Sequence, residues 1–202
     1  MQLKHRGTKT IETTRLKLRK FARDDAESVF HNWAKDADVA RYLSWSEHTS
    51  IEITREVLKK WTEAYVLPHS YEWGIELKES GELIGSIGLP RLEENSTIAE
   101  VGYCIGKKYW NKGIVTEALT AVMEFCFREV GFESVIARHD VENPASGRVM
   151  KKCGMRYLGC KPVIMPQKND AVSMCDIFII TKSEWESLFL NPARRATSPR
   201  KT

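Results

Sequence analysis

A polar turn around Gly113 runs straight into a helical stretch in the sequence YWNKGIVTEAL, from Tyr109 to Leu119. A strand-like run, AEVGYCI, lies just before it, from Ala99 to Ile105. A turn that opens a helix after a strand directs unpaired backbone N–H groups and the positive end of the helix dipole at one point. A glycine there lets the backbone approach a ligand and adopt a positive φ. The pattern indicates a seat for a diphosphate, although an ordinary turn before a helix has the same local sequence.

Two segments in a fixed order carry a wider resemblance. The run AEVGYCIGKKYWNKGIVTEAL is followed by ENPASGRVMKKCGM, from Glu142 to Met155. Together they resemble the GCN5-related N-acetyltransferase (GNAT) superfamily, and within it the branch that acetylates the N-termini of ribosomal proteins. The resemblance extends from about Thr13, in ETTRLKLRKF, to about Leu188. It is specific for the superfamily and does not identify the acceptor.

The resemblance implies a fold and a reaction. The expected fold is α/β, with a mixed, largely antiparallel sheet of about seven strands, splayed between the fourth and fifth, and about four helices. Acetyl-CoA is the expected co-substrate, attacked directly by a primary amine in a ternary complex, and a protein N-terminal α-amine is the preferred acceptor. Two alternatives are open. One is a small-amine acetyltransferase acting on a polyamine, an amino acid or an aminoglycoside, and the other is a non-catalytic module that binds CoA or associates with RNA.

The resemblance also assigns residues to acetyl-CoA. Backbone amides in the stretch 111–116 are expected to bind the diphosphate, and the backbone at the end of the fourth strand is expected to pair with the pantetheine amides. Asn143 would hydrogen-bond the pantetheine arm, and Lys152 would meet the phosphates unless it is an ordinary solvent-facing lysine. The expected cofactor-binding residues are Cys104, Ile105, Asn111, Lys112, Gly113, Ile114, Val115, Thr116, Asn143 and Lys152.

Acetyl transfer needs a base for the amine and a proton donor for the leaving thiolate. An α-amino group, with a pKa of roughly 7.7 to 8.0, is closer to its reactive form at neutral pH than a lysine amine. Glu100 lies close to where catalytic carboxylates occur in several members of the superfamily. Strand alternation puts it on one face with Gly102 and Cys104. Glu100 is the candidate base, and a strand glutamate paired with a nearby lysine or arginine is the alternative.

Ser146 is the candidate acid. Asn143 and Pro144 are favoured at a helix start, so N-P-x-S is locally a well-made N-terminus. The resemblance adds that the Ser146 hydroxyl could protonate the CoA thiolate. Two residues depart from the family pattern: Val115 stands where glycine or alanine is usual, and Phe178 stands where many relatives have a tyrosine that acts as the acid. The second departure favours Ser146 or solvent in that role.

Hydrophobic periodicity predicts the elements that position these residues. Strands are expected near 16–18, 71–77, 83–89, 98–105, 134–139, 156–164 and 173–180. Helices are expected near 26–33, 49–65, 114–129 and 143–154, with a last turn near 183–188. Thr49 and Glu52 form a capping-box pattern at the second helix. Aromatic residues near the first two helices are interpreted as core, with acceptor contact as the alternative: Trp33, Tyr42, Trp45 and Trp61.

The composition indicates one globular domain. The chain has 202 residues, of which 42% are hydrophobic and 29% are charged, enough to bury a core. We expect a single domain over 1–190 and a basic, disordered tail over 191–202. The tail holds Arg194, Arg195, Arg200 and Lys201, which together match the net charge of +4. It is either simply solvated or makes weak contact with ribosomal RNA.

The remaining expectations concern location and partners. No apolar run approaches the roughly 20 residues of a membrane span, so we expect a cytoplasmic protein with no membrane contact. Five cysteines without a C-x-x-C pair are expected as free, mostly buried thiols in a reducing compartment. The five histidines are scattered, and no metal is expected. Relatives of this branch are often dimers, so a homodimer is an open expectation.

Overall fold

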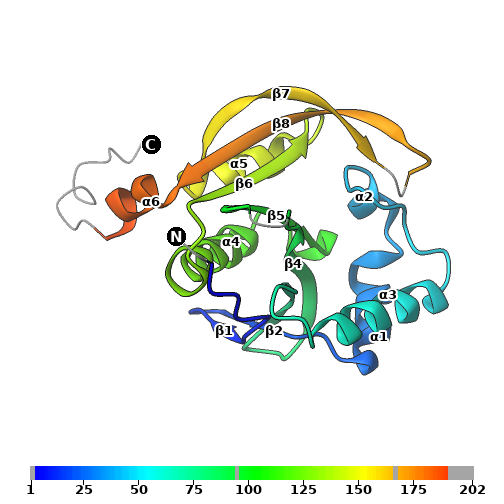
Figure 1. The fold of residues 1–202 in the computed structure, drawn as a ribbon. Helices are drawn as coiled ribbons and strands as arrows, with labels where there is room; N and C mark the ends of the chain where they lie inside the picture. Colours follow the sequence, from blue (N-terminus) through cyan, green and yellow to red (C-terminus); the bar gives the residue numbers. More distant parts are fainter. Residues whose placement is uncertain (1–2, 94–95, 166–167, 191–202) are drawn as a thin grey trace.

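A computed structural model describes residues 3–93, 96–165 and 168–190. Within them, eight strands form one mixed sheet in the order β1-β2-β3-β4-β5-β6-β8-β7 (Figure 1). The strands are β1 (Ile11–Glu12), β2 (Leu16–Arg19), β3 (Glu72–Leu77), β4 (Leu83–Arg91), β5 (Ile98–Ile105), β6 (Ser134–Asp140), β7 (Arg156–Met165) and β8 (Ala171–Thr181). The seven predicted strands are all present. The sequence did not predict β1, which is too short for a periodic pattern and pairs with β2 at the sheet edge.

The sheet opens between its two central strands. β5 and β6 pair in parallel from Ile98↔Ser134 to Val101↔Ala137, and their pairing stops there. β5 then continues alongside β4, while β6 continues alongside β8. The expected splay between the fourth and fifth predicted strands is therefore confirmed. The other strand pairs are antiparallel, so the sheet is largely antiparallel as expected.

Helices cover both faces of the sheet. Those of the described residues are α1 (Ala26–Val29), α2 (Ala37–Ala40), α3 (Ile51–Ala64), α4 (Ile114–Phe125), α5 (Pro144–Lys152) and α6 (Lys182–Phe189). α1 continues into a π-helical turn at Phe30–Ala34, and α4 into one at Cys126–Val130. α2 was not predicted from the sequence. It is a single turn capped by Asp36, whose side chain accepts from the Asp38 amide.

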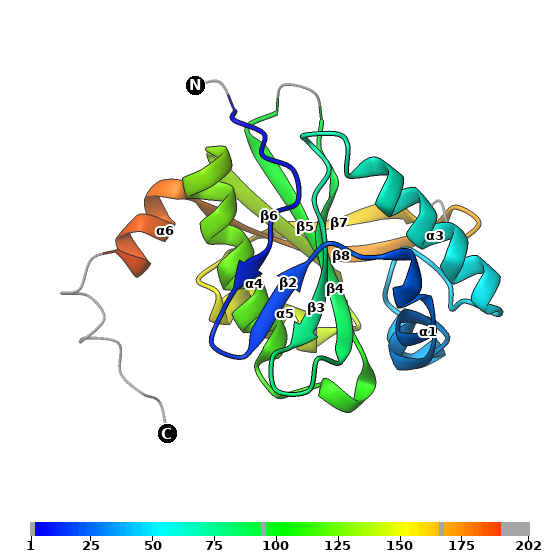
Figure 2. The ribbon, with the colours of Figure 1, turned by 90° about the horizontal axis from the view of Figure 1, so that it is seen from below.

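Two apolar layers position the elements around the opening. α4 packs on one face of the sheet and buries Leu119 and Val122 in the main core. α1 and α3 pack on the opposite face, where Trp33 and Leu58 belong to a second core (Figure 2). Each fully buried apolar side chain contributes roughly 1.5–3 kcal/mol. These layers hold the start of α4 and the segment around α2 on two sides of the splayed strands.

The predicted capping box at the second helix is wrong. α3 begins after Ser50, whose side chain makes no capping hydrogen bond, and the third residue of the helix is Ile53, which cannot return one. A capping box does form at α6, where Thr181 Oγ1 accepts from the Glu184 amide at 3.2 Å. In return, Glu184 Oε2 accepts from the Thr181 amide at 2.8 Å. The difference is one of register, because α3 starts one residue later than the Thr49 pattern requires.

The five cysteines are free, and only Cys160 is exposed, as expected. Among the residues described, no helix is long and apolar enough to cross a bilayer. The basic tail over 191–202 lies outside the described residues. Its expected disorder therefore stays a prediction, as does the domain boundary at 190.

Candidate active site

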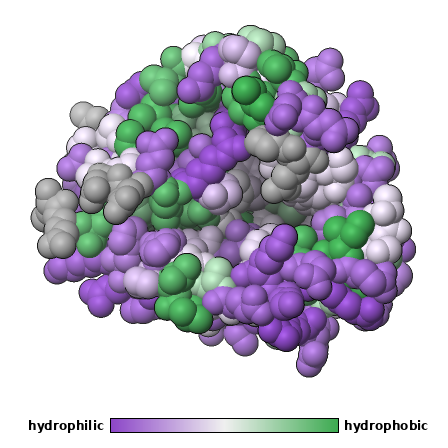
Figure 3. Space-filling view, turned by 45° about the vertical axis from the view of Figure 1, so that its right-hand side comes forward, coloured by the Kyte–Doolittle hydropathy of each residue, from purple (hydrophilic) through white to green (hydrophobic). Residues whose placement is uncertain are grey.

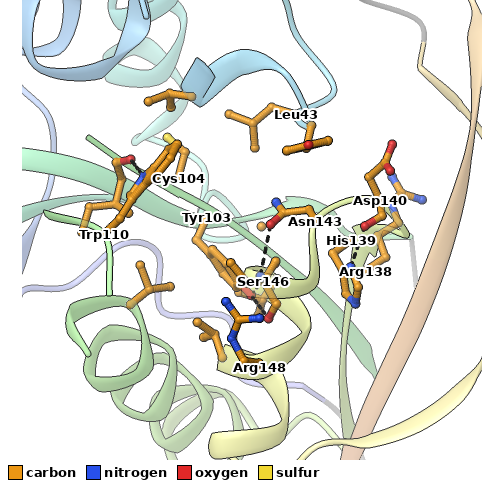
Figure 4. Close-up of a pocket in the computed structure, with 18 of the residues that line it drawn as sticks. Leu43, Tyr103, Cys104, Trp110, Arg138, His139, Asp140, Asn143, Ser146 and Arg148 are labelled. Atoms are coloured by element: carbon orange, nitrogen blue, oxygen red, sulfur yellow. Dashed lines mark hydrogen bonds between the residues drawn. The ribbon is translucent and has the colours of Figure 1, made fainter. Parts of the chain in front are cut away.

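A cleft of about 530 Å³ lies where β5 and β6 separate, a size typical of small-molecule sites. Figure 3 shows the surface hollowed near the centre of this face, and Figure 4 shows side chains that line the hollow. Every residue that the sequence predicted for the site lines this cleft: Glu100, Cys104, Ile105, Asn111, Lys112, Gly113, Ile114, Val115, Thr116, Asn143, Ser146 and Lys152.

The turn before α4 has the geometry of an anion seat. Gly113 is the N-cap of α4 and has a φ of 72°, a conformation that costs other residues free energy. The first-turn amides of Ile114, Val115 and Thr116 have no acceptor within the helix, and none of them donates to another described residue. The Val115 side chain belongs to the main core. The turn therefore offers several free donors and the helix dipole to one point in the cleft.

Arg15 braces this turn from the start of β2. Its Nη1 donates to the Lys112 carbonyl at 3.0 Å, and its Nε donates to Glu117 Oε2 in α4 at 2.7 Å. Glu117 Oε1 accepts from the Arg15 amide at 2.9 Å and from Thr13 Oγ1 at 2.6 Å. Two segments far apart in sequence therefore fix the backbone of the turn from the side away from the cleft lining.

The open half of β5 presents unpaired backbone groups. The Gly106 amide donates to the Ile84 carbonyl of β4 at 2.9 Å. Alternate residues of an antiparallel strand turn their backbone groups toward the same neighbour, so the Cys104 backbone also faces β4. The backbone groups of Tyr103 and Ile105 face the side where β6 has diverged. The groups available to a ligand thus belong to Tyr103 and Ile105 rather than to Cys104.

Two side chains complete this end of β5. Trp110 Nε1 donates to the Ile105 carbonyl at 2.9 Å, which folds the indole back over the strand end. The Cys104 thiol lies 3.4 Å from Ser86 Oγ. Burial raises the pKa of Cys104 to about 11, so this thiol is neutral at physiological pH. The Trp110 bond uses one lone pair of the Ile105 carbonyl and leaves the Ile105 N–H free for a ligand.

Glu100 and Arg138 form an ion pair across the start of the opening. Glu100 Oε1 lies 3.2 Å from Arg138 Nε, and both side chains are mostly buried. Glu100 pairs with Ile136 in the parallel register, and Arg138 lies two residues further along β6. Both side chains therefore point to the same face, the one that α1 and α3 cover. The pairing matches the alternative interpretation of Glu100. The second oxygen, Oε2, accepts no hydrogen bond from a described residue, and both residues line the cleft.

Tyr103 and Ser146 meet on the opposite face. The Tyr103 hydroxyl lies 2.8 Å from Ser146 Oγ and 3.3 Å from the Ser146 carbonyl, and its one proton can be donated to either oxygen (Figure 4). Ser146 lies in the first turn of α5. Its amide donates at 3.3 Å to the side chain of Asn143, which caps the helix. The cleft therefore has a carboxylate on one face and a pair of hydroxyl groups on the other.

His139 lines the cleft beside these hydroxyl groups, and the buried Phe178 ring packs behind it. Their rings stack with centroids 5.7 Å apart, and His139 Nδ1 lies 2.7 Å from the Asp140 carbonyl. A Cβ atom at Gly147 would come within 2.5 Å of His139 Nε2, so a larger residue at this position of α5 would force the buried His139 ring to shift. Phe178 has no hydroxyl, so it cannot be the acid that a tyrosine at this position could be.

The far end of the cleft lies between α2 and the β7–β8 hairpin. Lys168 Nζ donates to the carbonyls of Ala40 and Arg41, both at 2.9 Å. These bonds join the hairpin to the end of α2, which lie close together in Figure 1. Tyr42 and Leu43 follow α2 and line the cleft. This end is therefore a partly covered entrance with an aromatic and an apolar wall.

The four aromatic residues near the first two predicted helices were interpreted as core, with contact to the acceptor as the alternative. Trp33 is buried in the second core, and Trp45 and Trp61 pack against it. Tyr42 alone of the four lines the cleft. The core interpretation holds for the three tryptophans.

Sequence reasoning missed Tyr103, Arg138 and Arg15. Tyr103 is next to a predicted cleft residue, but its role depends on the position of α5, which no local pattern gives. Arg138 could have been found as a cation on the neighbouring predicted strand, provided that the strand register was known. Arg15 gives no local signal, because it acts on a turn 97 positions away.

The family model described as Acetyltransferase (GNAT) domain matches residues 15–156. The chain therefore belongs to the GNAT family of acetyltransferases and is an N-acetyltransferase by class. It is 32% identical over 149 residues to the uncharacterized N-acetyltransferase YoaA of Bacillus subtilis (strain 168), covering 74% of this chain and 84% of the relative.

Two further likenesses bear on the branch. The chain is 25% identical over 157 residues to the ribosomal-protein-serine acetyltransferase of Escherichia coli (strain K12), covering 76% of this chain and 86% of the relative. It shares the fold of RimL, the ribosomal L7/L12 alpha-N-protein acetyltransferase, solved in complex with coenzyme A. That match has a TM-score of 0.74 at 18% identity and covers 86% of this chain and 98% of the other. The likeness to the Escherichia coli enzyme supports the suspected ribosomal-protein branch, and the likeness to RimL shows the shared fold.

Proposed function

We propose that this chain transfers the acetyl group of acetyl-CoA directly to the N-terminal α-amine of a protein, of the kind found on ribosomal proteins. One observation carries the proposal: a single cleft holds both the free amides of the Gly113 turn and the carboxylate of Glu100. The similarity to an Escherichia coli enzyme named for ribosomal-protein serine supports the acceptor.

The cleft fits acetyl-CoA, which supplies an acetyl group already activated as a thioester. The amides that follow Gly113 would hold the diphosphate, because they are unpaired donors at a helix N-terminus. Tyr103 and Ile105 would pair their open backbone groups with the pantetheine amides, a task that the sequence assigned to Cys104 and Ile105. Asn143 would contact the same arm, and Lys152, at the end of α5, would meet a phosphate.

Glu100 would accept the proton of the attacking amine, directly or through one water. Arg138 holds Oε1, which leaves Oε2 as the basic atom. A general base of this type typically contributes about 10²–10⁴ in rate. An α-amine needs less help than a lysine amine because more of it is unprotonated near neutral pH.

Ser146 would direct its hydroxyl at the leaving sulfur. It lies on the opposite face of the splayed strands from Glu100, so the amine and the thiolate are served from different sides. The acceptor would enter between α2 and the hairpin, past Tyr42 and Leu43. An extended peptide N-terminus suits an entrance of this kind, since only the α-amine must reach Glu100.

Matched acceptors test the proposal. One is a serine-initiated peptide with a free α-amine and no lysine; the other is the same peptide with a blocked N-terminus and one internal lysine. Spermidine and an aminoglycoside complete the set, and products are identified by mass spectrometry. We expect acetylation of the free α-amine only. Acetylation of spermidine or the aminoglycoside without acetylation of either peptide would instead make the protein a small-amine acetyltransferase.

A further inference from the structure

Tyr103 bridges the opening between β5 and α5. Its ring lies on the face opposite Glu100, and its hydroxyl is 2.8 Å from Ser146 Oγ (Figure 4). Burial raises the pKa of Tyr103 well above its ordinary value, so the phenol keeps its proton at any pH at which the protein would work. Tyr103 is thus a permanent neutral donor aimed at the first turn of α5.

The bond decides where the Ser146 proton points. A serine hydroxyl has one proton and a freely rotating C–O bond. The phenol has one proton, and the shorter of its two contacts is to Ser146 Oγ, at 2.8 Å, rather than to the Ser146 carbonyl, at 3.3 Å. When the phenol donates its proton to Ser146 Oγ, the serine cannot donate its own proton to the tyrosine. Its proton is then available to the cleft, where Asn143 and the end of β5 also converge.

We propose that Tyr103 is a positioning residue that holds the Ser146 hydroxyl with its proton directed at the sulfur of coenzyme A. This inference rests on the proposed function, because it concerns the thiol that leaves in acetyl transfer. As the C–S bond breaks, the sulfur keeps the electron pair and accepts a hydrogen bond from Ser146, which accepts one from Tyr103. The thiolate takes its proton from solvent, since a thiol, with a pKa of about 8.5 in cysteine, is a far stronger acid than an aliphatic hydroxyl.

The consequence is measurable without turnover. A hydrogen bond donated to a thiolate favours the charged form and lowers the pKa of that thiol. CoA that carries no acetyl group is bound to the protein, and its thiol is titrated by the ultraviolet absorbance of the thiolate. The same titration with desulfo-CoA, which lacks the sulfur, subtracts the cysteines of the protein.

Four proteins are compared: wild type, Tyr103→Phe, Ser146→Ala and the double variant. We expect the pKa of the bound thiol to rise by about 1 in Ser146→Ala. In Tyr103→Phe it should rise by roughly half as much, because the serine keeps its hydroxyl but loses its orientation. The double variant should match Ser146→Ala. Tyr157→Phe is the control, since Tyr157 is an exposed tyrosine on β7 and should leave the pKa of the thiol unchanged.

Turnover gives a second readout. With an accepted amine, Tyr103→Phe should lower kcat by roughly 5- to 10-fold with little change in the KM for acetyl-CoA, and should have no further effect on Ser146→Ala. The inference would be overturned if the bound thiol had the same pKa in Tyr103→Phe as in wild type. It would also be overturned if the reductions in kcat of the two single variants multiplied in the double variant. The expected pattern of thiol pKa values in a protein that acetylates no amine would leave the inference standing and refute the proposed function.

Discussion

At the scale of single residues, Glu100 has features of both roles considered for it, a catalytic base and a partner in an ion pair. Its carboxylate pairs with Arg138 at 3.2 Å, as a structural glutamate would, and it also lines the cleft. A cation on one oxygen does not remove the other as a proton acceptor. The pairing instead fixes the direction in which the free oxygen points, and an oriented base is more effective than a mobile one.

Glu100→Gln should lower turnover by about 10²-fold below about pH 8, where the acceptor is mostly protonated, and by less at higher pH. The pH–rate profile of kcat/KM measures this. Glu124→Gln is a suitable control, because Glu124 forms an exposed pair with Arg128 on α4 and has no contact with the cleft. If Glu100→Gln keeps the wild-type profile, Glu100 has no part in the chemistry.

Residues whose role follows from local backbone chemistry were predictable from sequence. Gly113 and Asn143 are examples, because a positive φ and a helix cap depend on neighbours in the chain. Tyr103 and Arg138 were not predictable, because their partners come from other elements. Their roles depend on strand register and on where α5 packs, which are tertiary properties.

At the scale of elements, the start of α4 is fixed by groups on both sides of the turn. Gly113→Glu should weaken acetyl-CoA binding by at least about tenfold, since a left-handed side-chain residue costs ~1–2 kcal/mol and adds a carboxylate beside the diphosphate. Gly131→Glu is the matched control. Gly131 also has a positive φ, of 92°, but ends the turn after α4 and lies outside the cleft lining. Calorimetric affinities that fall equally in both variants would place the diphosphate elsewhere.

The Arg15 brace should also act on cofactor binding. Arg15→Gln loses the bonds to Lys112 and Glu117, so we expect acetyl-CoA affinity to fall by roughly 3- to 10-fold while kcat changes little. Arg156→Gln removes a similar exposed pair, with Glu184 at 2.8 Å, and should leave both values unchanged. A fall in kcat alone for Arg15→Gln would contradict the brace.

At the scale of the whole molecule, the order of strands and the splay follow from periodicity combined with the family resemblance. β1 and α2 escaped prediction because each is shorter than the window in which a period can be recognised. The capping box predicted at Thr49 was wrong because a helix boundary can lie a residue or two from the position that the sequence indicates. The bridge between Lys168 and α2 joins distant segments, and no pattern within either segment encodes it.

Glu72, at the start of β3, makes the stability of the fold depend on pH. Burial raises the pKa of Glu72 to about 8, against 4.5 in the unfolded reference. The folded protein therefore holds more protons than the unfolded chain between these values, and the free energy of unfolding falls as pH rises through this range. Glu72→Gln mimics the protonated form. It should leave the melting temperature unchanged near pH 5. Near pH 8 it should raise the melting temperature, with the free energy of unfolding higher by on the order of 2 kcal/mol. If the melting temperatures of variant and wild type differed by the same amount at both pH values, this role of Glu72 would be excluded.

The central claim is that the cleft between β5 and β6 performs acetyl transfer to an amine. Thiol release from acetyl-CoA, followed with and without a serine-initiated peptide for wild type and Gly113→Glu, tests it most directly. We expect release that depends on the peptide, saturates with acetyl-CoA and shows a higher KM for acetyl-CoA in the variant. Tight acetyl-CoA binding with no amine-dependent release, for this peptide or for any small amine, would contradict the claim and identify a CoA-binding module without catalysis.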